Sequence, residues 1–261
     1  MRVWGCFVAG ALVACSVDPV QLEGRTCPCV AGWVCDGTNH CVIADGSVSP
    51  EASDDGGADA SDADAGNLIF DEEFDGGTLD TTNKWVVGGD GNWFIQNGLG
   101  EQSNGSSSTA ILYAQGFATA TDYHIVTRMH STGPFDAGQD LAPEIAFRID
   151  PTQMAFGVVT NVRCNVDLQQ NQLLIQATTT TLNTTLDTTN LPIPPNFDAS
   201  TWFVLDAVVT GSAAKCTVTF DGNLPTVAVT TNQLPIASGP FGLKTYTTQA
   251  EFAYFRVYSV P

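Results

Sequence analysis

Basic residues are scarce in this chain of 261 residues. Nine Lys and Arg stand against 28 Asp and Glu, so the formal net charge is -19 at neutral pH. Proteins that bind DNA or RNA neutralise the phosphates with clustered Lys and Arg side chains. The composition therefore argues against nucleic acid as a partner.

Histidine is rarer still, and motifs for nucleophilic catalysis are missing. The three histidines are His40, His124 and His130, and none stands in a recognisable pattern with a Ser or Cys nucleophile. A hydrolase triad needs a base within hydrogen-bond reach of its nucleophile. The sequence predicts no such triad.

A long apolar run is also absent at the N-terminus, where a short one follows Arg2. Residues 3–14 are apolar, which suits the core of an export signal but falls short of the roughly 20 residues that span a bilayer. The run ends in Leu12-Val13-Ala14-Cys15. Those residues resemble the lipobox of bacterial lipoproteins, in which the cysteine is acylated and becomes the mature N-terminus.

The lipobox resemblance implies where the protein is located in the cell. It implies a signal peptide over 1–14, lipidation of Cys15 and a lipidated stalk over 15–26. The protein would be held at the membrane by its lipid, in the cell envelope, as an outer membrane lipoprotein that is periplasmic or surface-exposed. The alternatives are an ordinary secretory signal and a short buried helix.

The remaining cysteines form two even sets. Four lie together, Cys27, Cys29, Cys35 and Cys41, while Cys164 and Cys216 form a separate pair. Even sets in an exported chain predict disulfides. Zinc is the alternative for the first set, but its Cys-Pro-Cys start lacks the usual spacing of two intervening residues.

Residues 27–43 are therefore expected to form a small disulfide-rich knot. A bridge from Cys27 to Cys29 across one proline would be strained. Pairing Cys27 with Cys35 and Cys29 with Cys41 is preferred, and the nested arrangement stays open. The segment is similar to cysteine-rich motifs beside the anchor in lipoproteins of myxobacterial type.

An acidic segment follows over 44–66. It is rich in Asp, Ala, Ser and Gly and holds no basic residue. Such a composition cannot bury enough apolar surface to fold. We predict a disordered linker that holds the next domain away from the membrane.

Residues 67–261 change to short alternating runs of Val, Ile, Phe, Thr and Tyr between Gly, Asn, Asp and Pro. Amphipathic helical patterns are nearly absent. Strands are expected at 68–74, 93–96, 110–114, 123–130, 144–149, 155–162, 173–177, 202–210, 216–220, 227–230, 241–246 and 251–260. About twelve strands at this spacing predict an all-β sandwich or jelly roll. Asn97-Gly98 predicts a hairpin, and the Thr-rich segment 178–190 suits an edge strand.

Both ends of this region carry one resemblance. The opening Leu68-Ile69-Phe70-Asp71-Glu72-Glu73-Phe74, with Trp85 after it, and the closing Phe252-Ala253-Tyr254-Phe255-Arg256-Val257-Tyr258 resemble the first and last strands of concanavalin A-like lectin and glucanase domains. The resemblance implies a jelly-roll β-sandwich in which these two strands pair. That architecture serves lectins, glycosidases, adhesion modules and spacers.

The catalytic motif of the family 16 glucanases is not met. That motif, Glu-x-Asp-x-Glu, projects alternate carboxylates from one strand, and a retaining pair must lie about 5 to 5.5 Å apart. The nearest stretch begins at Glu144 and ends at Asp150, with Ala146 and Arg148 where carboxylates are needed. Catalysis is not expected, although a pair from different strands stays open.

Glycan binding by the same sandwich is the preferred interpretation. Side chains that could hydrogen-bond or stack on a sugar are Trp93, Tyr113, Arg128, His130, Glu144 and Arg148. For each of these residues the structural alternative is a surface ion pair of small value or an aromatic ring in the core.

A structural calcium is implied by the resemblance, and no other cofactor is expected. Ala253 occupies the place of a common aspartate ligand, which leaves Glu72, Glu73 and Asp75 as oxygen ligands. The whole sequence thus predicts a surface-anchored lipoprotein with a non-catalytic glycan-binding or adhesion domain. The alternatives are a glycoside hydrolase of a concanavalin A-like or 3-keto-glycoside hydrolase-like family, and a structural envelope protein.

Overall fold

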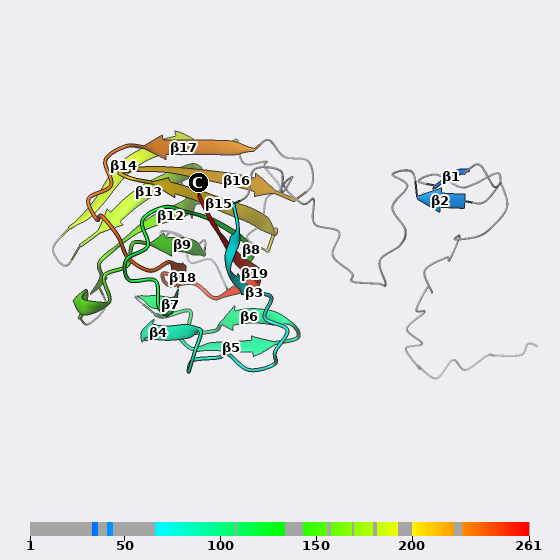
Figure 1. Ribbon diagram of the computed structural model, residues 1–261, viewed down its shortest axis with the longest axis horizontal. Coiled ribbons are helices and arrows are strands. Elements are labelled where there is room, and N and C mark those ends of the chain that lie inside the picture. Colours follow the sequence, from blue (N-terminus) through cyan, green and yellow to red (C-terminus); the bar gives the residue numbers. More distant parts are fainter. Residues whose placement is uncertain are drawn as a thin grey trace, which may run out of the picture. The chain divides into compact units, whose positions relative to one another are not determined.

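The fold was analysed in a computed structural model of the chain (Figure 1). The described residues are 33–35, 41–43, 66–107, 109–133, 143–155, 158–168, 170–179, 182–192, 200–221 and 226–260. Backbone contacts divide the chain into two units, Met1–Ala60 and Ser61–Pro261. No helix among these described ranges is both long and apolar enough to cross a membrane.

The first unit contains one described hairpin. Strand β1 (Trp33–Cys35) pairs antiparallel with β2 (Cys41–Ile43), which sets Cys35 opposite Cys41 along the backbone. Cys15, Cys27 and Cys29 lie outside the described residues. The lipidated cysteine, the disulfide pairing of the knot and the linker over 44–66 therefore stay predictions.

The second unit is an antiparallel sandwich of two sheets. One sheet has seven strands in the spatial order β14-β13-β12-β9-β18-β7-β4. Its strands are β4 (Trp85–Gly89), β7 (Ala110–Ala114), β9 (Glu144–Phe147), β12 (Asn161–Asp167), β13 (Gln172–Thr178), β14 (Asn183–Asn190) and β18 (Gly242–Thr245). Figure 1 shows these strands stacked along one side of the unit.

The other sheet has eight strands in the order β17-β16-β15-β8-β19-β6-β5, with β3 also paired to β19. Its strands are β3 (Leu68–Glu72), β5 (Trp93–Gln96), β6 (Leu99–Gln102), β8 (Tyr123–Ser131), β15 (Phe203–Thr210), β16 (Ala213–Phe220), β17 (Val227–Thr231) and β19 (Ala250–Ser259). The pairing of β3 with β19 confirms that the first and last strands of the domain are neighbours.

Period-two alternation produces the core between the sheets. In β15, the inward side chains Phe203, Leu205, Ala207 and Val209 are buried while the intervening residues are half-buried or exposed. Alternate side chains of a strand point to opposite faces, so each strand supplies one row to the core. Aromatic rings fill the centre, where Phe70 packs edge-on against Trp85, Phe241 and Phe255.

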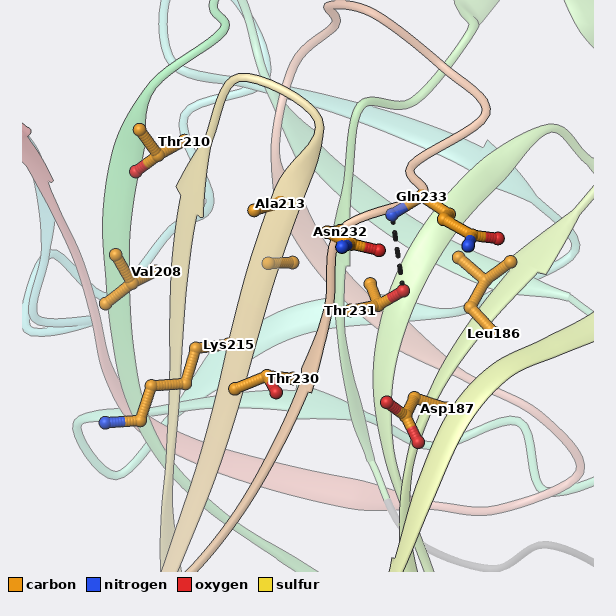
Figure 2. A pocket seen from close by; sticks show the side chains of 11 residues that line it. Leu186, Asp187, Val208, Thr210, Ala213, Lys215, Thr230, Thr231, Asn232 and Gln233 are labelled. Atoms are coloured by element: carbon orange, nitrogen blue, oxygen red, sulfur yellow. Dashed lines mark hydrogen bonds between the residues drawn. The ribbon is translucent and has the colours of Figure 1, made fainter.

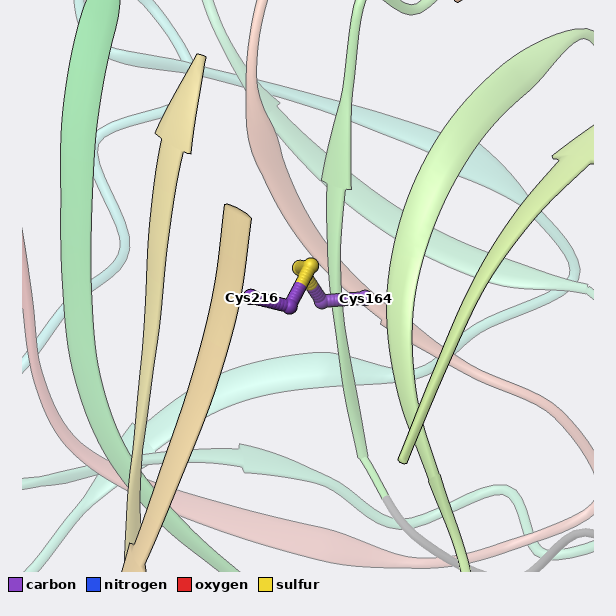
Figure 3. The surroundings of a disulfide bond; sticks show 2 residues. All are labelled: Cys164 and Cys216. Atoms are coloured by element: carbon purple, nitrogen blue, oxygen red, sulfur yellow. A yellow bond between two sulfur atoms is a disulfide. The ribbon is translucent and has the colours of Figure 1, made fainter. Parts of the chain in front are cut away.

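A disulfide joins the two sheets through this core. Cys164 of β12 bonds Cys216 of β16, and their Cα atoms are 5.9 Å apart (Figure 3). Both residues are fully buried. The predicted pairing of these two cysteines is therefore present, and it crosses between the sheets.

One turn and one edge agree with the sequence expectations. Asn97 and Gly98 have φ values of 55° and 76° between β5 and β6, as an Asn-Gly hairpin turn requires. The Thr-rich strand β14 lies at the edge of its sheet. The all-β sandwich predicted from the alternating runs is confirmed.

One predicted strand was wrong in its extent. The expected strand 155–162 is interrupted. After a 3-10 turn (η2, Pro151–Gln153), β10 (Met154–Ala155) and β11 (Val158–Val159) form a short hairpin, and β12 begins at Asn161. The predicted alternation from Glu144 to Asp150 also fails, because Arg148 has a φ of 49°. A residue in the left-handed region ends the pleat of a strand.

Candidate functional site

Polar side chains are buried on the outer face of the seven-stranded sheet, the face that points away from the core. They are Glu144, Asn161, Arg163, Asn165, Asp167, Gln176 and Lys244, and each is exposed by 9% or less. Buried charges and amides are costly unless they find partners. We call this surface, together with Tyr113, Ala146 and Gly242, the polar face.

Strand β12 supplies four of these side chains. Val162, Cys164 and Val166 point into the core, so the alternate residues Asn161, Arg163, Asn165 and Asp167 point outward. The pattern Asn-Val-Arg-Cys-Asn-Val-Asp is strict polar and apolar alternation, and all seven residues are buried.

An ionic cluster occupies the middle of the polar face. The Lys244 ammonium lies 2.8 Å from Glu144 Oε2, and Arg163 Nε lies 3.5 Å from the same oxygen. Glu144 is 1% exposed and Lys244 is 3% exposed. Each of these charges is therefore held in place by an opposite charge inside the protein.

All three nitrogens of the Arg163 guanidinium also donate to β13. Its Nε and Nη2 donate to Gln176 Oε1 at 3.0 and 2.6 Å, and its Nη1 donates to Thr178 Oγ1 at 2.9 Å. Gln176 stands directly across from Arg163 on β13. The guanidinium is thus fixed by a neighbouring strand as well as by Glu144.

Asn165 differs from these neighbours. It is fully buried, and neither its amide nitrogen nor its amide oxygen has a hydrogen-bond partner. Asn161, on the same strand, donates from Nδ2 to the Val159 carbonyl at 2.6 Å but leaves its Oδ1 unpartnered. Buried amides without partners are rare in folded proteins.

Small residues form the floor beside these groups. The register sets Arg163 opposite Ala146, Ala146 opposite Gly242, and Gly242 opposite Tyr113. A Cβ on Gly242 would collide with the carbonyl oxygen of Leu112. This row therefore runs from a guanidinium, past two small residues, to an aromatic ring.

An apolar cluster borders the row at its Tyr113 end. Ile111, Tyr113, Ala146, Ile149 and Val159 pack together there. Tyr113 is 9% exposed, and burial raises the pKa of its hydroxyl. The ring therefore stays a neutral phenol that can stack and donate a hydrogen bond.

Two carboxylates lie on the polar face, on neighbouring strands. Glu144 accepts from Lys244, and Asp167 Oδ1 accepts from the Gln170 backbone N–H at 2.7 Å. Both are thus engaged within the protein. The arrangement as a whole suits recognition of a polar molecule by hydrogen bonds and stacking.

The sequence-predicted residues separate into different places. Glu144 and Tyr113 both lie on the polar face. Arg128 and His130 lie on β8 of the other sheet. Arg128 Nη2 donates to Asp221 at 2.7 Å and its guanidinium lies 4.8 Å from the Trp202 ring, while His130 Nε2 is 2.7 Å from Glu251 Oε2.

Arg148 lies at a junction of loops. It is fully buried, and its guanidinium donates to the backbone carbonyls of Ile236, Thr121 and Gly211. Those contacts tie three connecting segments to the end of β9. Its partners are thus backbone groups of the fold.

Trp93 lies on β5 and packs against Phe252, with ring centroids 5.6 Å apart. Its indole nitrogen is buried and has no hydrogen-bond partner. The six predicted residues are therefore not one site. Glu144 and Tyr113 share the polar face, whereas Arg128 and His130 both pack against Trp202 on the other sheet.

Two of the three carboxylates considered for calcium already have protein partners. Glu72 accepts from Trp85 Nε1 at 3.0 Å and from Lys84 at 3.3 Å, and Glu73 accepts from Arg256 at 2.7 Å. Within the described ranges, no group of three or more His, Cys, Asp or Glu side chains could hold a metal ion. A calcium site stays an expectation from the resemblance.

An open depression lies along strands β14 to β17 (Figure 2). We call it the edge groove. Its lining includes Asp187, Lys215, Thr230, Asn232 and Gln233, and its volume is about 570 Å³. None of its lining side chains is aromatic or has a buried polar atom without a partner. The polar face is therefore the stronger candidate.

Sequence reasoning missed most of the polar face. Asn161, Arg163, Asn165 and Asp167 were passed over because the strand was expected to stop at residue 162. The signal was present, since the alternation through Asp167 is the strand period itself.

Comparisons with known proteins support the fold. No family model and no curated protein matches the sequence. Among solved structures, the chain is similar to a Bacillus subtilis protein of unknown function with a galectin-like fold, at 10% identity and a TM-score of 0.54, covering 75% of this chain and 97% of that one.

Two lectin structures also match. The exoplasmic/lumenal domain of VIP36 in its Ca2+/Man-bound form shares 11% identity with a TM-score of 0.53, over 74% of this chain and 91% of that one. Winged bean acidic lectin complexed with methyl-α-D-galactose shares 10% identity with a TM-score of 0.51, over 73% and 97%. The domain from Ser61 to Pro261 has a concanavalin A-like lectin fold.

Proposed function

We propose that this protein binds glycans through the polar face of its sandwich domain. The observation that carries the proposal is Asn165, a fully buried amide with no partner, in a row of hydrogen-bonding side chains that the fold holds rigid. The sugar-bound lectin structures of similar fold support the same class of ligand. A ligand would supply the partners that Asn165 lacks.

The polar face has the parts that sugar recognition uses. Tyr113 offers a ring for stacking, and Arg163 with Gln176 offers fixed polar groups. Binding sites commonly combine apolar surface with a few positioned polar groups. Tyr113 and Gln176, each 9% exposed, mark where this face meets solvent.

The experiment is a glycan array with the purified full-length chain and with Tyr113→Ala. We expect saturable binding to at least one glycan, and a loss of about tenfold or more in Tyr113→Ala, since 1.4 kcal/mol of lost contact is tenfold in Kd. Tyr254→Ala is the matched control, because Tyr254 lies on β19 of the other sheet. Equal losses in both variants would refute this site.

A reducing-sugar assay on the array hits separates binding from hydrolysis. Glu144 and Asp167 are each engaged by the protein's own groups, so we expect no sugar release. Release that disappears in Glu144→Gln would instead favour a glycoside hydrolase.

We further propose that the domain is displayed from the cell envelope by a lipid on Cys15. The support is the apolar run 3–14 that ends in Leu-Val-Ala-Cys. In the native host, we expect the protein in the membrane fraction and Cys15→Ser in the soluble fraction. A Cys15→Ser protein that stayed membrane-associated would contradict lipidation.

A further inference from the structure

We infer that an open cleft between β3 and β19 is a second ligand site, which takes one sugar ring through two neighbouring hydroxyls. We call it the β3–β19 cleft. Its volume is about 530 Å³, and its lining includes Leu68, Asp71, Glu73, Arg256 and Tyr258. These strands belong to the eight-stranded sheet, so the cleft shares no residue with the polar face. Either site can therefore fail while the other stands.

Two rows of side chains cross the β3–β19 cleft. Arg256 stands directly across from Asp71, and Tyr258 stands across from Leu68. Phe255 and Val257 belong to the core, so the alternate residues of β19 point outward. The two rows lie about 7 Å apart along the strand, which is the scale of a single sugar ring. One row is polar and the other is apolar.

Arg256 presents a guanidinium whose outer edge is open. Its Nε donates to Glu73 Oε1 at 2.7 Å, and the guanidinium lies 4.6 Å from the Tyr254 ring. No described residue accepts a hydrogen bond from its Nη1 or Nη2, and 33% of the side chain is exposed. Glu73 and Tyr254 thus hold the guanidinium in place while its terminal N–H groups remain available to a ligand.

Asp71 offers acceptors beside these donors. Its carboxylate is 45% exposed, and it lies 3.8 Å from Arg256 Nε, which is too far for a hydrogen bond. A hydroxyl both donates and accepts. Two neighbouring hydroxyls can therefore bind here together, one accepting from Arg256 and the other donating to Asp71.

Another Arg–Asp pair on the same sheet shows what a closed pair is like. Arg128 Nη2 donates to Asp221 Oδ2 at 2.7 Å, so the two side chains satisfy each other directly. Asp221 is 47% exposed, close to the value for Asp71. The two aspartates have similar exposure, and Asp71 is the one whose carboxylate accepts no hydrogen bond from the described residues.

The apolar row supplies a surface for the sugar ring. Leu68 is 50% exposed although it is a large apolar side chain. The Tyr258 ring stands across from it and lies 5.8 Å from the His124 ring, measured between centroids. Ligand sites combine apolar and aromatic surface with a few positioned polar groups. The C–H face of a sugar can pack on Leu68 and Tyr258 while its hydroxyls reach the polar row.

A site of this size binds one ring weakly, with a Kd of about 1 mM, because few ligand atoms are buried. Such binding is washed from a glycan array, so the array reports on the polar face. A second site on the opposite side of the sandwich would allow one molecule to bridge two glycan chains, and bridging multiplies weak affinities.

The test is an NMR titration of the full-length chain with the methyl glycosides of glucose, galactose and mannose. The local readout is the side-chain Nε–H signal of Arg256, which is identified by its loss in Arg256→Lys. We expect this signal to shift saturably with at least one of the three sugars.

Two aspartate variants locate the contact. Asp71→Ala is expected to weaken the binding that shifts the Arg256 signal by tenfold or more. Asp221→Ala is the matched control, since it removes the same charge from an equally exposed position outside the cleft. It should bind as the unaltered chain does, and thermal unfolding of both variants shows whether the fold persists.

The outcomes separate this inference from the proposed function. Shifts that persist in Asp71→Ala, or that disappear equally in Asp221→Ala, would overturn the inference. So would sodium acetate shifting the Arg256 signal at lower concentration than every sugar, because the cleft would then be an anion site. Array binding that is lost in Tyr113→Ala, with no sugar shifting the Arg256 signal, would leave the polar face standing and overturn the cleft. Shifts at Arg256 without any array binding would do the reverse.

Discussion

The outer faces of the two sheets carry similar polar residues, which are partly exposed on one sheet and buried on the other. On the eight-stranded sheet, Arg128, His124 and Arg256 each contact a carboxylate and each keeps at least 22% of its side chain exposed. On the seven-stranded sheet, Glu144 and Lys244 contact each other with 1% and 3% of their side chains exposed. Exposed pairs contribute about 0–1 kcal/mol, whereas a buried pair carries a large desolvation cost.

Unpartnered atoms sharpen the same contrast. Arg128 Nε and His130 Nδ1 are buried without partners, but each side chain bonds a carboxylate through another nitrogen. Asn165 has no bond through either amide atom. On these two faces, Asn165 is thus the buried side chain whose hydrogen-bonding capacity the fold leaves wholly unused.

The largest effect is expected from breaking the buried ion pair. Lys244→Met leaves the Glu144 carboxylate buried, with only Arg163 at 3.5 Å, and should lower the free energy of unfolding by about 3–5 kcal/mol. Arg128→Met, on the other face, should cost about 1 kcal/mol or less. Urea unfolding measures both.

A double variant tests the reason for that loss. Glu144→Gln combined with Lys244→Met removes the uncompensated charge and should recover part of the stability. If Lys244→Met and Arg128→Met lowered the free energy of unfolding by similar amounts, the buried ion pair would not contribute more to stability than the exposed one.

The second-largest loss of stability is expected from removing the disulfide between the sheets. Replacing Cys164 and Cys216 with Ala opens a loop of 52 residues and should lower the free energy of unfolding by about 2–4 kcal/mol. A reductant should lower the unaltered chain to the same value and leave the variant unaffected. Alkylation of both thiols in the unreduced, denatured protein would show that the bond does not form.

Asn165→Leu is expected to change the free energy of unfolding by a smaller amount, and to raise it. Because its amide is buried without partners, Asn165→Leu should raise the free energy of unfolding by about 1 kcal/mol or more. Asn161→Leu should gain less, since it also removes the bond from Nδ2 to the Val159 carbonyl. A loss of stability in Asn165→Leu would mean that a bound water already satisfies the amide.

The sequence predicted the architecture well because a sandwich depends on local signals. Alternation placed Phe203, Leu205 and Ala207 in the core, the Asn97-Gly98 turn set a hairpin, and the end motifs predicted that β3 pairs with β19. Each of these signals depends on a few consecutive residues.

The site was harder to predict because it depends on register across strands. Glu144, Arg163 and Lys244 come from β9, β12 and β18, which lie far apart in the chain. Arg148 illustrates the opposite error, since its charge resembles that of a binding residue while its guanidinium holds three loop carbonyls. A residue of a binding site is told from a structural residue by its burial and its partners, and the sequence alone shows neither.

The smallest predicted effect concerns Glu101, on the outer face of the eight-stranded sheet. Glu101 stands directly across from Glu251 on the outer face of the eight-stranded sheet, and burial followed by the Glu251 charge raises the pKa of Glu101. A carboxyl with a raised pKa in the folded state favours folding while it is protonated, and that contribution is lost as the pH rises through the folded pKa.

Glu101→Gln should therefore raise the free energy of unfolding at pH 7 by about 0.2–1 kcal/mol, the usual size of a like-charge pair across strands. The gain should vanish below about pH 4, where the native carboxyl is protonated. Glu251→Gln should not reproduce it, because that change also removes the partner of His130 at 2.7 Å. If the gain in unfolding free energy from Glu101→Gln did not change with pH, it would have to come from packing. Repulsion between Glu101 and Glu251 would then contribute little to the stability of this face.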